Sequence, residues 1–127
     1  MAILTDEVKQ LLKEQGIAFV ATTSKDGIPN VSVKGSIQVI DDDTLAFACI
    51  WSEKTMRNLE DNPQIAIALA DTKALKGFQV KGKAVLENSG PLFDRLSESL
   101  AKMKLPPPKS IAKIAVTELY QWPPARA

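Results

Sequence analysis

The stretch Trp51–Leu59, WSEKTMRNL, combines residue types that can hold a negatively charged group at the start of a helix. Ser52 is a suitable N-cap, because its hydroxyl can accept a hydrogen bond from a free backbone N–H two or three residues later. Glu53 suits the positive end of the helix dipole, whereas a cation such as Lys54 opposes it by roughly 0.3–1 kcal/mol. A lysine followed by Thr55 at this place therefore points to a bound anion.

The same residues also fit an ordinary solvent-exposed first turn. Glu53 and Arg57 are spaced four residues apart, and such a pair stabilises a helix by about 0.2–0.5 kcal/mol. Spacing alone favours this simpler interpretation. By the same reasoning Lys34, which lies in a predicted strand, is an exposed strand residue, as most lysines are.

The composition excludes several kinds of catalytic site. The 127 residues include no histidine, which rules out Ser-His-Asp triads, Cys-His pairs and histidine-ligated metals. Cys49 is the single cysteine, and we interpret it as a small buried hydrophobe rather than a redox thiol. The run Asp41–Asp43 is a turn that lacks the further ligands calcium needs. We predict no metal site, and we expect any chemistry to come from a bound cofactor.

Charge and hydropathy limit the classes of binding partner and the cellular locations that we expect. The chain has 16 basic and 15 acidic side chains without a sustained basic block, which disfavours binding to nucleic acid or anionic membranes. The sequence contains no run of 18 or more apolar residues, so no membrane span is predicted. Residues 1–16 lack the features of a signal peptide, so a cytoplasmic location is expected. The length and the 45% apolar content predict a single domain over residues 1–127.

Periodicity predicts a mainly β protein of the α+β class with short helices. The first helix covers residues 6–15, is capped by Thr5 or Asp6, and ends at Gly16. Two more helices are predicted, one from Ser52 to Asn62-Pro63 and one from Gly90-Pro91. Six strands are predicted, at residues 17–23, 31–40, 44–51, 64–71, 77–87 and 111–122. Their short links favour an antiparallel sheet, and closure into a small barrel would remove exposed edges.

The strand patterns also predict which faces are covered. Alternation in strand 31–40 separates two sets, Val31, Val33, Ile37 and Val39 on one face and Ser32, Lys34, Ser36 and Gln38 on the other. Segments 17–23 and 64–71 are apolar on both faces, so both of their faces should be covered. Gly82 indicates a bulge or a close approach of two strands.

These elements bring the polar residues together. If strands 31–40 and 44–51 form a hairpin, Lys34 and Ser36 lie near residues 48–51. The helix that begins at Ser52 starts from the end of the same hairpin, so its free N–H groups converge with the following side chains, Lys54, Thr55, Arg57 and Asn58. Oriented donors, a dipole and fixed cations make a phosphate site. Such a barrel could hold a phosphorylated planar ligand.

Three motifs, in this order and spacing, resemble a known family. They are A-T-x-x-x-D-G-x-P-x-V at 21–31, V-K-G-S-I at 33–37 and S-x-K-T-x-x-N-L-x-x-N-P at 52–63. The chain is similar to the FMN-binding split barrels of the pyridoxamine 5′-phosphate oxidase-like superfamily, and especially to its short FMN-binding proteins. The resemblance covers residues 5–87 well, and it implies a six-stranded antiparallel split β-barrel.

The resemblance further implies a homodimer with FMN in two equivalent clefts at the interface. Lys54 and Thr55 would bind the FMN phosphate beside Ser52, and Asn58 would support the loop. Along the second strand, the residues lining the flavin would be Lys34, Gly35 and Ser36. The opposite wall would be formed by Ala48, Cys49, Ile50 and Trp51. The C-terminal segment near Trp122 would reach the flavin of the neighbouring subunit.

The chain departs from the true oxidases of this superfamily, which carry extra basic residues for a second phosphate. The C-terminal YQWPPARA has one arginine, so pyridoxamine 5′-phosphate oxidation is not expected. Electron transfer or a small flavin oxidoreductase activity is the leading hypothesis, and whether the protein is an enzyme stays open. The alternatives are a non-catalytic barrel that binds another phosphorylated ligand or cofactor, such as a nucleotide or a deazaflavin, and a structural barrel with an empty cleft. The absence of histidine weakens a haem hypothesis.

Overall fold

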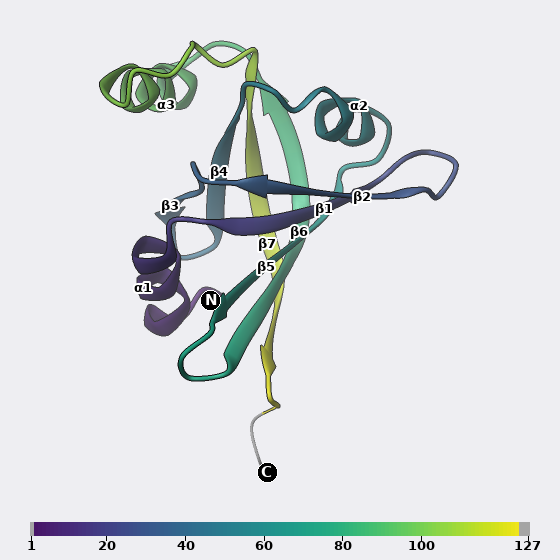
Figure 1. Ribbon diagram of the computed structural model, residues 1–127. Helices are drawn as coiled ribbons and strands as arrows, with labels where there is room; N and C mark the ends of the chain where they lie inside the picture. The colour runs from purple at the N-terminus through teal and green to yellow at the C-terminus, as the bar shows by residue number, and fades with distance from the viewer. Residues whose placement is uncertain (1, 125–127) are drawn as a thin grey trace.

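The computed structural model describes residues 2–124, which form a strongly curved sheet flanked by three helices (Figure 1). The strands are β1 (Ala18–Thr23), β2 (Pro29–Lys34), β3 (Gln38–Asp41), β4 (Thr44–Cys49), β5 (Gln64–Asp71), β6 (Lys76–Glu87) and β7 (Ser110–Trp122). The helices are α1 (Asp6–Gln15), α2 (Glu53–Asp61) and α3 (Pro91–Lys102). The predicted class, a mainly antiparallel sheet with short flanking helices, is confirmed.

The sheet has seven strands in the described residues, not the predicted six, and it is not closed. Its order is β2-β1-β5-β6-β7-β4-β3, so β2 and β3 lie at opposite ends although they follow one another in the chain. The predicted strand 31–40 is broken at residues 35–37. Its first half pairs with β1, and its second half pairs with β4.

The predicted faces of strand 31–40 are wrong for the same reason. Val31 and Val33 are exposed on the outside, whereas Lys34, beside them in the sequence, is buried. Ile37 and Val39 pack against the core. The break at residues 35–37 changes which face points inward, so alternation cannot be continued across it.

Residues 2–124 leave the outer faces of β1 and β5 uncovered, so they do not themselves provide the cover predicted for both faces of these strands. We call the patch formed by three neighbouring strands the outer apolar face; its members are Phe19, Ala21, Val31, Val33, Ala66 and Ala68. Phe19 pairs with both Val33 and Ala68, so the patch is continuous across the strands. Half of the Phe19 side chain is exposed.

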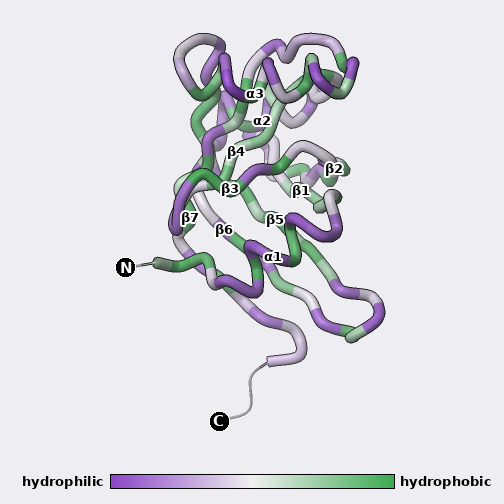
Figure 2. The backbone as a smooth tube through the Cα atoms, turned by 90° about the vertical axis from the view of Figure 1, so that its left-hand side faces the viewer, coloured by the Kyte–Doolittle hydropathy of each residue, from purple (hydrophilic) through white to green (hydrophobic). Residues whose placement is uncertain are grey.

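The core lies inside the curve of the sheet. Phe47, Ile67 and Ile114 are fully buried there, and α1 covers one opening with Val8 and its neighbours. In Figure 2, α1 alternates between hydrophilic and hydrophobic residues, as expected for a helix with one buried face.

Local signals in the sequence position α1 and the long strands. Thr5 accepts a hydrogen bond from the Val8 N–H at 3.3 Å, and Gly16 ends α1 with φ of 69°, so both predicted caps are confirmed. The predicted irregularity at Gly82 is confirmed by a register shift between β6 and β7. A Cβ atom at Gly82 would lie 2.3 Å from the carbonyl oxygen of Ala115. This is a steric clash, so only glycine fits at this position.

Within residues 2–124, no helix is long and apolar enough to cross a bilayer.

Candidate functional site

A cleft of about 270 Å³ lies where β2 ends, β4 ends and α2 begins. We call it the central cleft. Seven of the predicted site residues line it, namely Lys34, Gly35, Ser36, Ala48, Ile50, Trp51 and Ser52. Two further strand residues, Ser32 and Val33, and three residues at the end of α3 complete the lining. The structure thus brings together most of what the sequence predicted for the flavin groove.

The break between β2 and β3 creates the cleft. Gly35, Ser36 and Ile37 leave the ladder of hydrogen bonds, and the Ser36 hydroxyl instead accepts a hydrogen bond from the Ala48 N–H at 3.2 Å. Lys34 and Ser36 therefore lie beside the end of β4, as predicted. The prediction placed them in one strand paired with strand 44–51. In the structure β2 pairs with β1, and β3 pairs with β4.

Lys34 is the unusual residue of the cleft. Its side chain is only 8% exposed, it donates a hydrogen bond to the Ser52 hydroxyl, and its Nζ lies 5.4 Å from the centre of the Phe47 ring. No ion pair of Lys34 occurs among the described residues. Burial lowers the pKa of Lys34, and the nearby Cys49 acts in the opposite sense. The interpretation of Lys34 as an exposed strand residue is wrong.

Helix α2 begins directly after Ser52, at the predicted place, but Ser52 does not cap it with its side chain. The hydroxyl of Ser52 accepts from Lys34 instead. Within the described part of the chain, the first N–H groups of α2 therefore have no side-chain acceptor. The positive end of the helix dipole adjoins the Lys34 ammonium.

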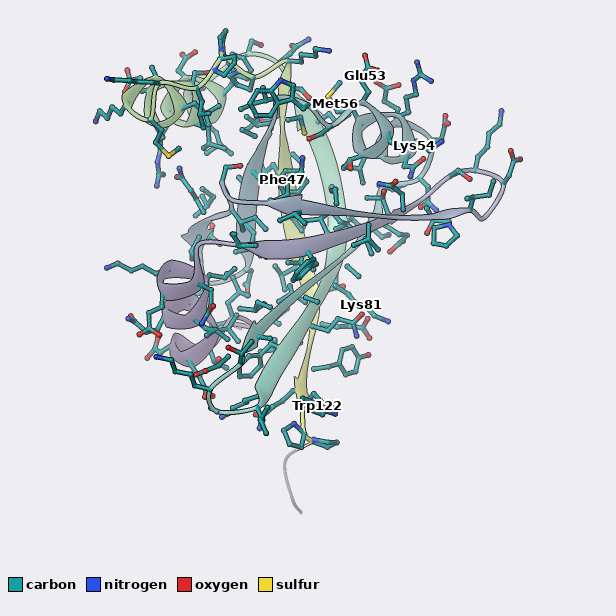
Figure 3. All side chains as sticks on the ribbon, viewed as in Figure 1. Phe47, Glu53, Lys54, Met56, Lys81 and Trp122 are labelled. Atoms are coloured by element: carbon teal, nitrogen blue, oxygen red, sulfur yellow. The ribbon has the colours of Figure 1, made fainter. Side chains whose placement is uncertain are left out.

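The residues that follow Ser52 lie outside the central cleft. Lys54 is exposed on the surface of α2 (Figure 3). Thr55 is 1% exposed, and its hydroxyl lies 3.2 Å from the Ser32 hydroxyl. Asn58 donates through Nδ2 to the Thr22 hydroxyl at 3.0 Å. Thr55 and Asn58 thus hold α2 against β2 and β1, which agrees with a supporting role for Asn58. Phosphate binding by Lys54 and Thr55 stays a prediction.

Two other predicted residues lie away from the central cleft. Cys49 is fully buried in the core, and burial raises the pKa of its thiol. Trp122 lies at the opposite end of the molecule from Lys54 (Figure 3) and is mostly exposed. It pairs with Gly77 near the end of β7, so it does not contact the cleft of its own chain.

The sequence reasoning missed the apolar wall of the cleft. Leu100, Met103 and Leu105, at and just after the end of α3, face the polar wall formed by Lys34 and Ser52. A smaller chamber of about 110 Å³ continues from the central cleft under α3, because the two spaces share lining residues such as Ser36, Leu100 and Met103.

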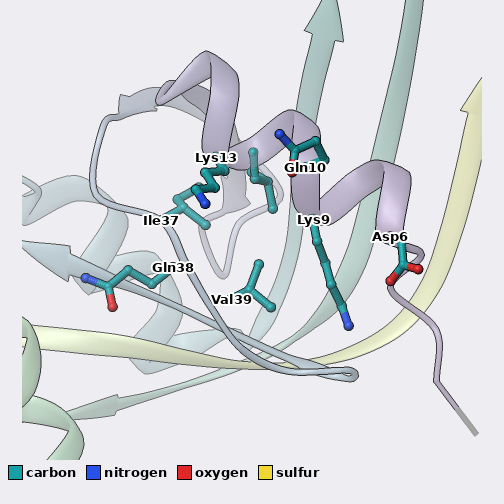
Figure 4. A pocket seen from close by; sticks show the side chains of 8 residues that line it. Asp6, Lys9, Gln10, Lys13, Ile37, Gln38 and Val39 are labelled. Atoms are coloured by element: carbon teal, nitrogen blue, oxygen red, sulfur yellow. The ribbon is translucent and has the colours of Figure 1, made fainter.

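A larger cleft, of about 570 Å³, separates α1 from β3 (Figure 4). Lys9 and Lys13 project from α1 over an apolar floor that includes Ile37 and Val39. Lys9 is paired with Asp42. None of the predicted site residues lines this cleft.

The chain matches a known protein family and is similar to several known proteins in sequence or structure. The profile of the family described as pyridoxamine 5′-phosphate oxidase matches residues 4–123. The uncharacterized protein MJ0282 of Methanocaldococcus jannaschii is 34% identical over 121 residues, which cover 92% of this chain and 79% of that protein. The crystal structure of HupZ from Group A Streptococcus is 29% identical, with a TM-score of 0.89 over 98% of this chain and 99% of that one.

Structures with lower identity share the fold and carry different descriptions. An FMN-binding protein from Syntrophomonas wolfei is 20% identical, with a TM-score of 0.79 over 93% of this chain and 85% of that one. An F420 reductase is 21% identical (TM-score 0.67; 87% and 94% of the two chains). HutZ, described as the haem storage protein of Vibrio cholerae, is 20% identical (TM-score 0.71; 93% and 94%).

Proposed function

The chain belongs to the pyridoxamine 5′-phosphate oxidase family, and from this we propose that it is a homodimeric FMN-binding protein that acts in electron transfer or as a small flavin oxidoreductase. When bound, FMN supplies the hydride or electron chemistry, and the protein supplies binding and orientation. The single observation that carries the proposal is the central cleft, in which the buried Lys34 ammonium, paired with no carboxylate of residues 2–124, faces an apolar wall.

The residues of the cleft fit FMN in charge and in shape. A phosphorylated ring ligand needs a cationic, donor-rich end and an apolar surface beside it. Lys34, Ser52 and the free N–H groups at the start of α2 provide the first. Met103, Leu105 and Trp51 provide the second, and Gly35 leaves room for close approach of a ring to the backbone.

The outer apolar face supports the homodimer. Exposed apolar patches of this kind mark protein interfaces, and the small side chains of Ala66 and Ala68 allow a second sheet to approach closely. The face extends into the central cleft, since Val33 belongs to both. A partner seated on this face would therefore close one side of the cleft.

The register of the sheet supports a contribution of Trp122 from the partner. One outward row of residues crosses five strands through Val33, Phe19, Ala68, Gln79 and Tyr120. Trp122 lies two residues beyond Tyr120 on the same side of β7. A two-fold axis through the middle of this row would bring β7 of one chain toward the β2 end of the other. The partner's Trp122 would then approach the central cleft.

The cofactor is tested by purification and titration. We expect purified protein to be yellow, to release FMN on denaturation, and to rebind FMN after stripping. Parallel titrations with a deazaflavin, a nucleotide and haem test the alternatives, and haem has no histidine ligand in this chain. A colourless protein that binds none of them would contradict the proposal.

The dimer is tested by sedimentation equilibrium of charged variants. Phe19→Asp lies in the outer apolar face and should give monomers that bind FMN weakly. Val85→Asp is the matched control, because Val85 is a strand residue outside this face and is at least as exposed as Phe19. Dimers that survive Phe19→Asp would refute the proposed interface.

A further inference from the structure

The cleft between α1 and β3, which we call the α1–β3 cleft, is separate from the site described above. Its volume of about 570 Å³ falls in the range of roughly 300–1,000 Å³ that small-molecule sites occupy. It shares no lining residue with the central cleft, although Ile37 and Gln38 also line the smaller chamber under α3. A ligand held between α1 and β3 would therefore be additional to a flavin.

The floor of the α1–β3 cleft is apolar. Ile37 and Val39, at the start of β3, are half-buried and pack against the core, and both also line the cleft. Leu12 of α1 lines it from the other side. An apolar body laid on this floor would remove the remaining exposed surface from water, which is favourable in proportion to the area covered.

Charge is distributed unevenly along the cleft. Asp6 begins α1, and Lys13 lies in the last turn of the same helix. Between them, Lys9 is paired with Asp42, and this pairing raises the pKa of Lys9. Lys13 is exposed, and no ion pair of Lys13 occurs among residues 2–124. Within these residues, the cleft thus offers one cation without a carboxylate partner, which extends beside Ile37 at the end away from Asp6 (Figure 4).

We propose that the α1–β3 cleft binds a monocarboxylate with an aliphatic chain, of the kind that medium-chain fatty acids provide. The carboxylate pairs with the Lys13 ammonium, and the chain lies along the apolar floor. One negative charge matches the single available cation, whereas a longer polyanion would be repelled by Asp6 at the other end. A cationic ligand would be repelled by Lys13 itself. This inference does not depend on the proposed function.

The probe is sodium octanoate, titrated into the full chain with the backbone amide chemical shifts of isotope-labelled protein as the readout. Amides of α1 and of residues 37–39 should shift, whereas those of residues 51–55 at the central cleft should not. Each methylene removed from the probe should weaken binding by up to about fourfold, since burying a methylene contributes about 0.8 kcal/mol. Octanol, which has the same chain length and no charge, should bind about fivefold more weakly than octanoate.

Substitutions test the cation. Lys13→Met should weaken octanoate binding about fivefold, the upper range for an exposed ion pair, and Lys13→Arg should restore it. Lys102→Met is the matched control, because Lys102 also lies in the last turn of a helix and lines neither cleft. This control should leave the octanoate Kd unchanged.

The location, the charge and the chain can each contradict the inference. Amide shifts that are absent at millimolar octanoate, or that map to the central cleft, would refute the location. An octanoate affinity that is unchanged in Lys13→Met, or that octanol equals, would refute the pairing with Lys13. Acetate that binds as tightly as octanoate would refute the role of the apolar floor.

Discussion

The hydrogen bond from Asn58 to Thr22 holds α2 against β1, and its removal gives a sharp test of how the helix is positioned. Both side chains are buried, with 3% and 2% exposed, and the Nδ2 to Oγ1 distance is 3.0 Å. Removing one partner leaves the other buried and unsatisfied, which costs about 1–3 kcal/mol. We therefore expect Asn58→Leu and Thr22→Val each to lower the free energy of unfolding by about 2 kcal/mol.

The double variant should cost less than the sum of the two single variants. Replacing both polar groups by apolar groups of similar shape leaves nothing unsatisfied, so a coupling energy of about 1–2 kcal/mol is expected. Urea unfolding at one fixed protein concentration measures these values, and an unchanged m-value shows that the unfolding reaction is the same.

An exposed hydrogen bond provides the control. Thr117 donates to the Lys81 carbonyl at 3.3 Å on the surface, and Thr117→Val should change the free energy of unfolding by less than about 0.5 kcal/mol. If the effects of Asn58→Leu and Thr22→Val are additive, this hydrogen bond does not hold α2 in place, and the supporting role of Asn58 is refuted.

Three further predictions follow from single residues. Gly82→Ala should destabilise the protein by about 3 kcal/mol, because the added Cβ would collide with the Ala115 carbonyl. Gly35→Ala is the control, since residue 35 has room for a Cβ. Thermal unfolding of the two variants would show whether their stabilities differ. Burial lowers the pKa of Lys34 below its ordinary value of 10.5, so the folded chain binds fewer protons than the unfolded chain just below pH 10.5. The free energy of unfolding of the wild type relative to Lys34→Met should then rise with pH in that window and level off above it; a flat difference would contradict the burial. Trp51→Ala should leave the free energy of unfolding within about 0.5 kcal/mol of the wild type, since this side chain is 77% exposed, and should weaken FMN binding in the same titrations; equal affinity would remove Trp51 from the site.

Local signals predicted the parts of the fold that depend on one or two residues. Thr5 and Gly16 cap α1 as expected, because capping depends on a hydroxyl acceptor and on a residue that tolerates positive φ. Gly82 marks a close approach that any side chain would block. The strand and helix at residues 44–61 were predicted almost to their ends, which is why most cleft residues were found.

Features set by long-range pairing could not be read from the sequence. Continuous alternation through residues 31–40 hides the change of partner strand at Gly35. The burial of Lys34 depends on the position of Phe47 and of Ser52 from other elements. The apolar wall depends on the turn after α3, where Lys104 has φ of 60°, a conformation that lysine rarely adopts.

The position of β2 and β3 at opposite ends of the sheet has a consequence for how the molecule opens. Residues 35–37 join β2 and β3, which are the first and last strands of the sheet order. The two margins of the sheet are therefore linked in the chain by three consecutive residues. Separating the margins would expose the central cleft without breaking the long ladder between β6 and β7. Residues 32–34 of β2 line the central cleft, and Gln38 of β3 lines the smaller chamber beside it. A molecule that fills both spaces should therefore slow amide exchange in β2 and β3 together, although these two strands are not neighbours in the sheet.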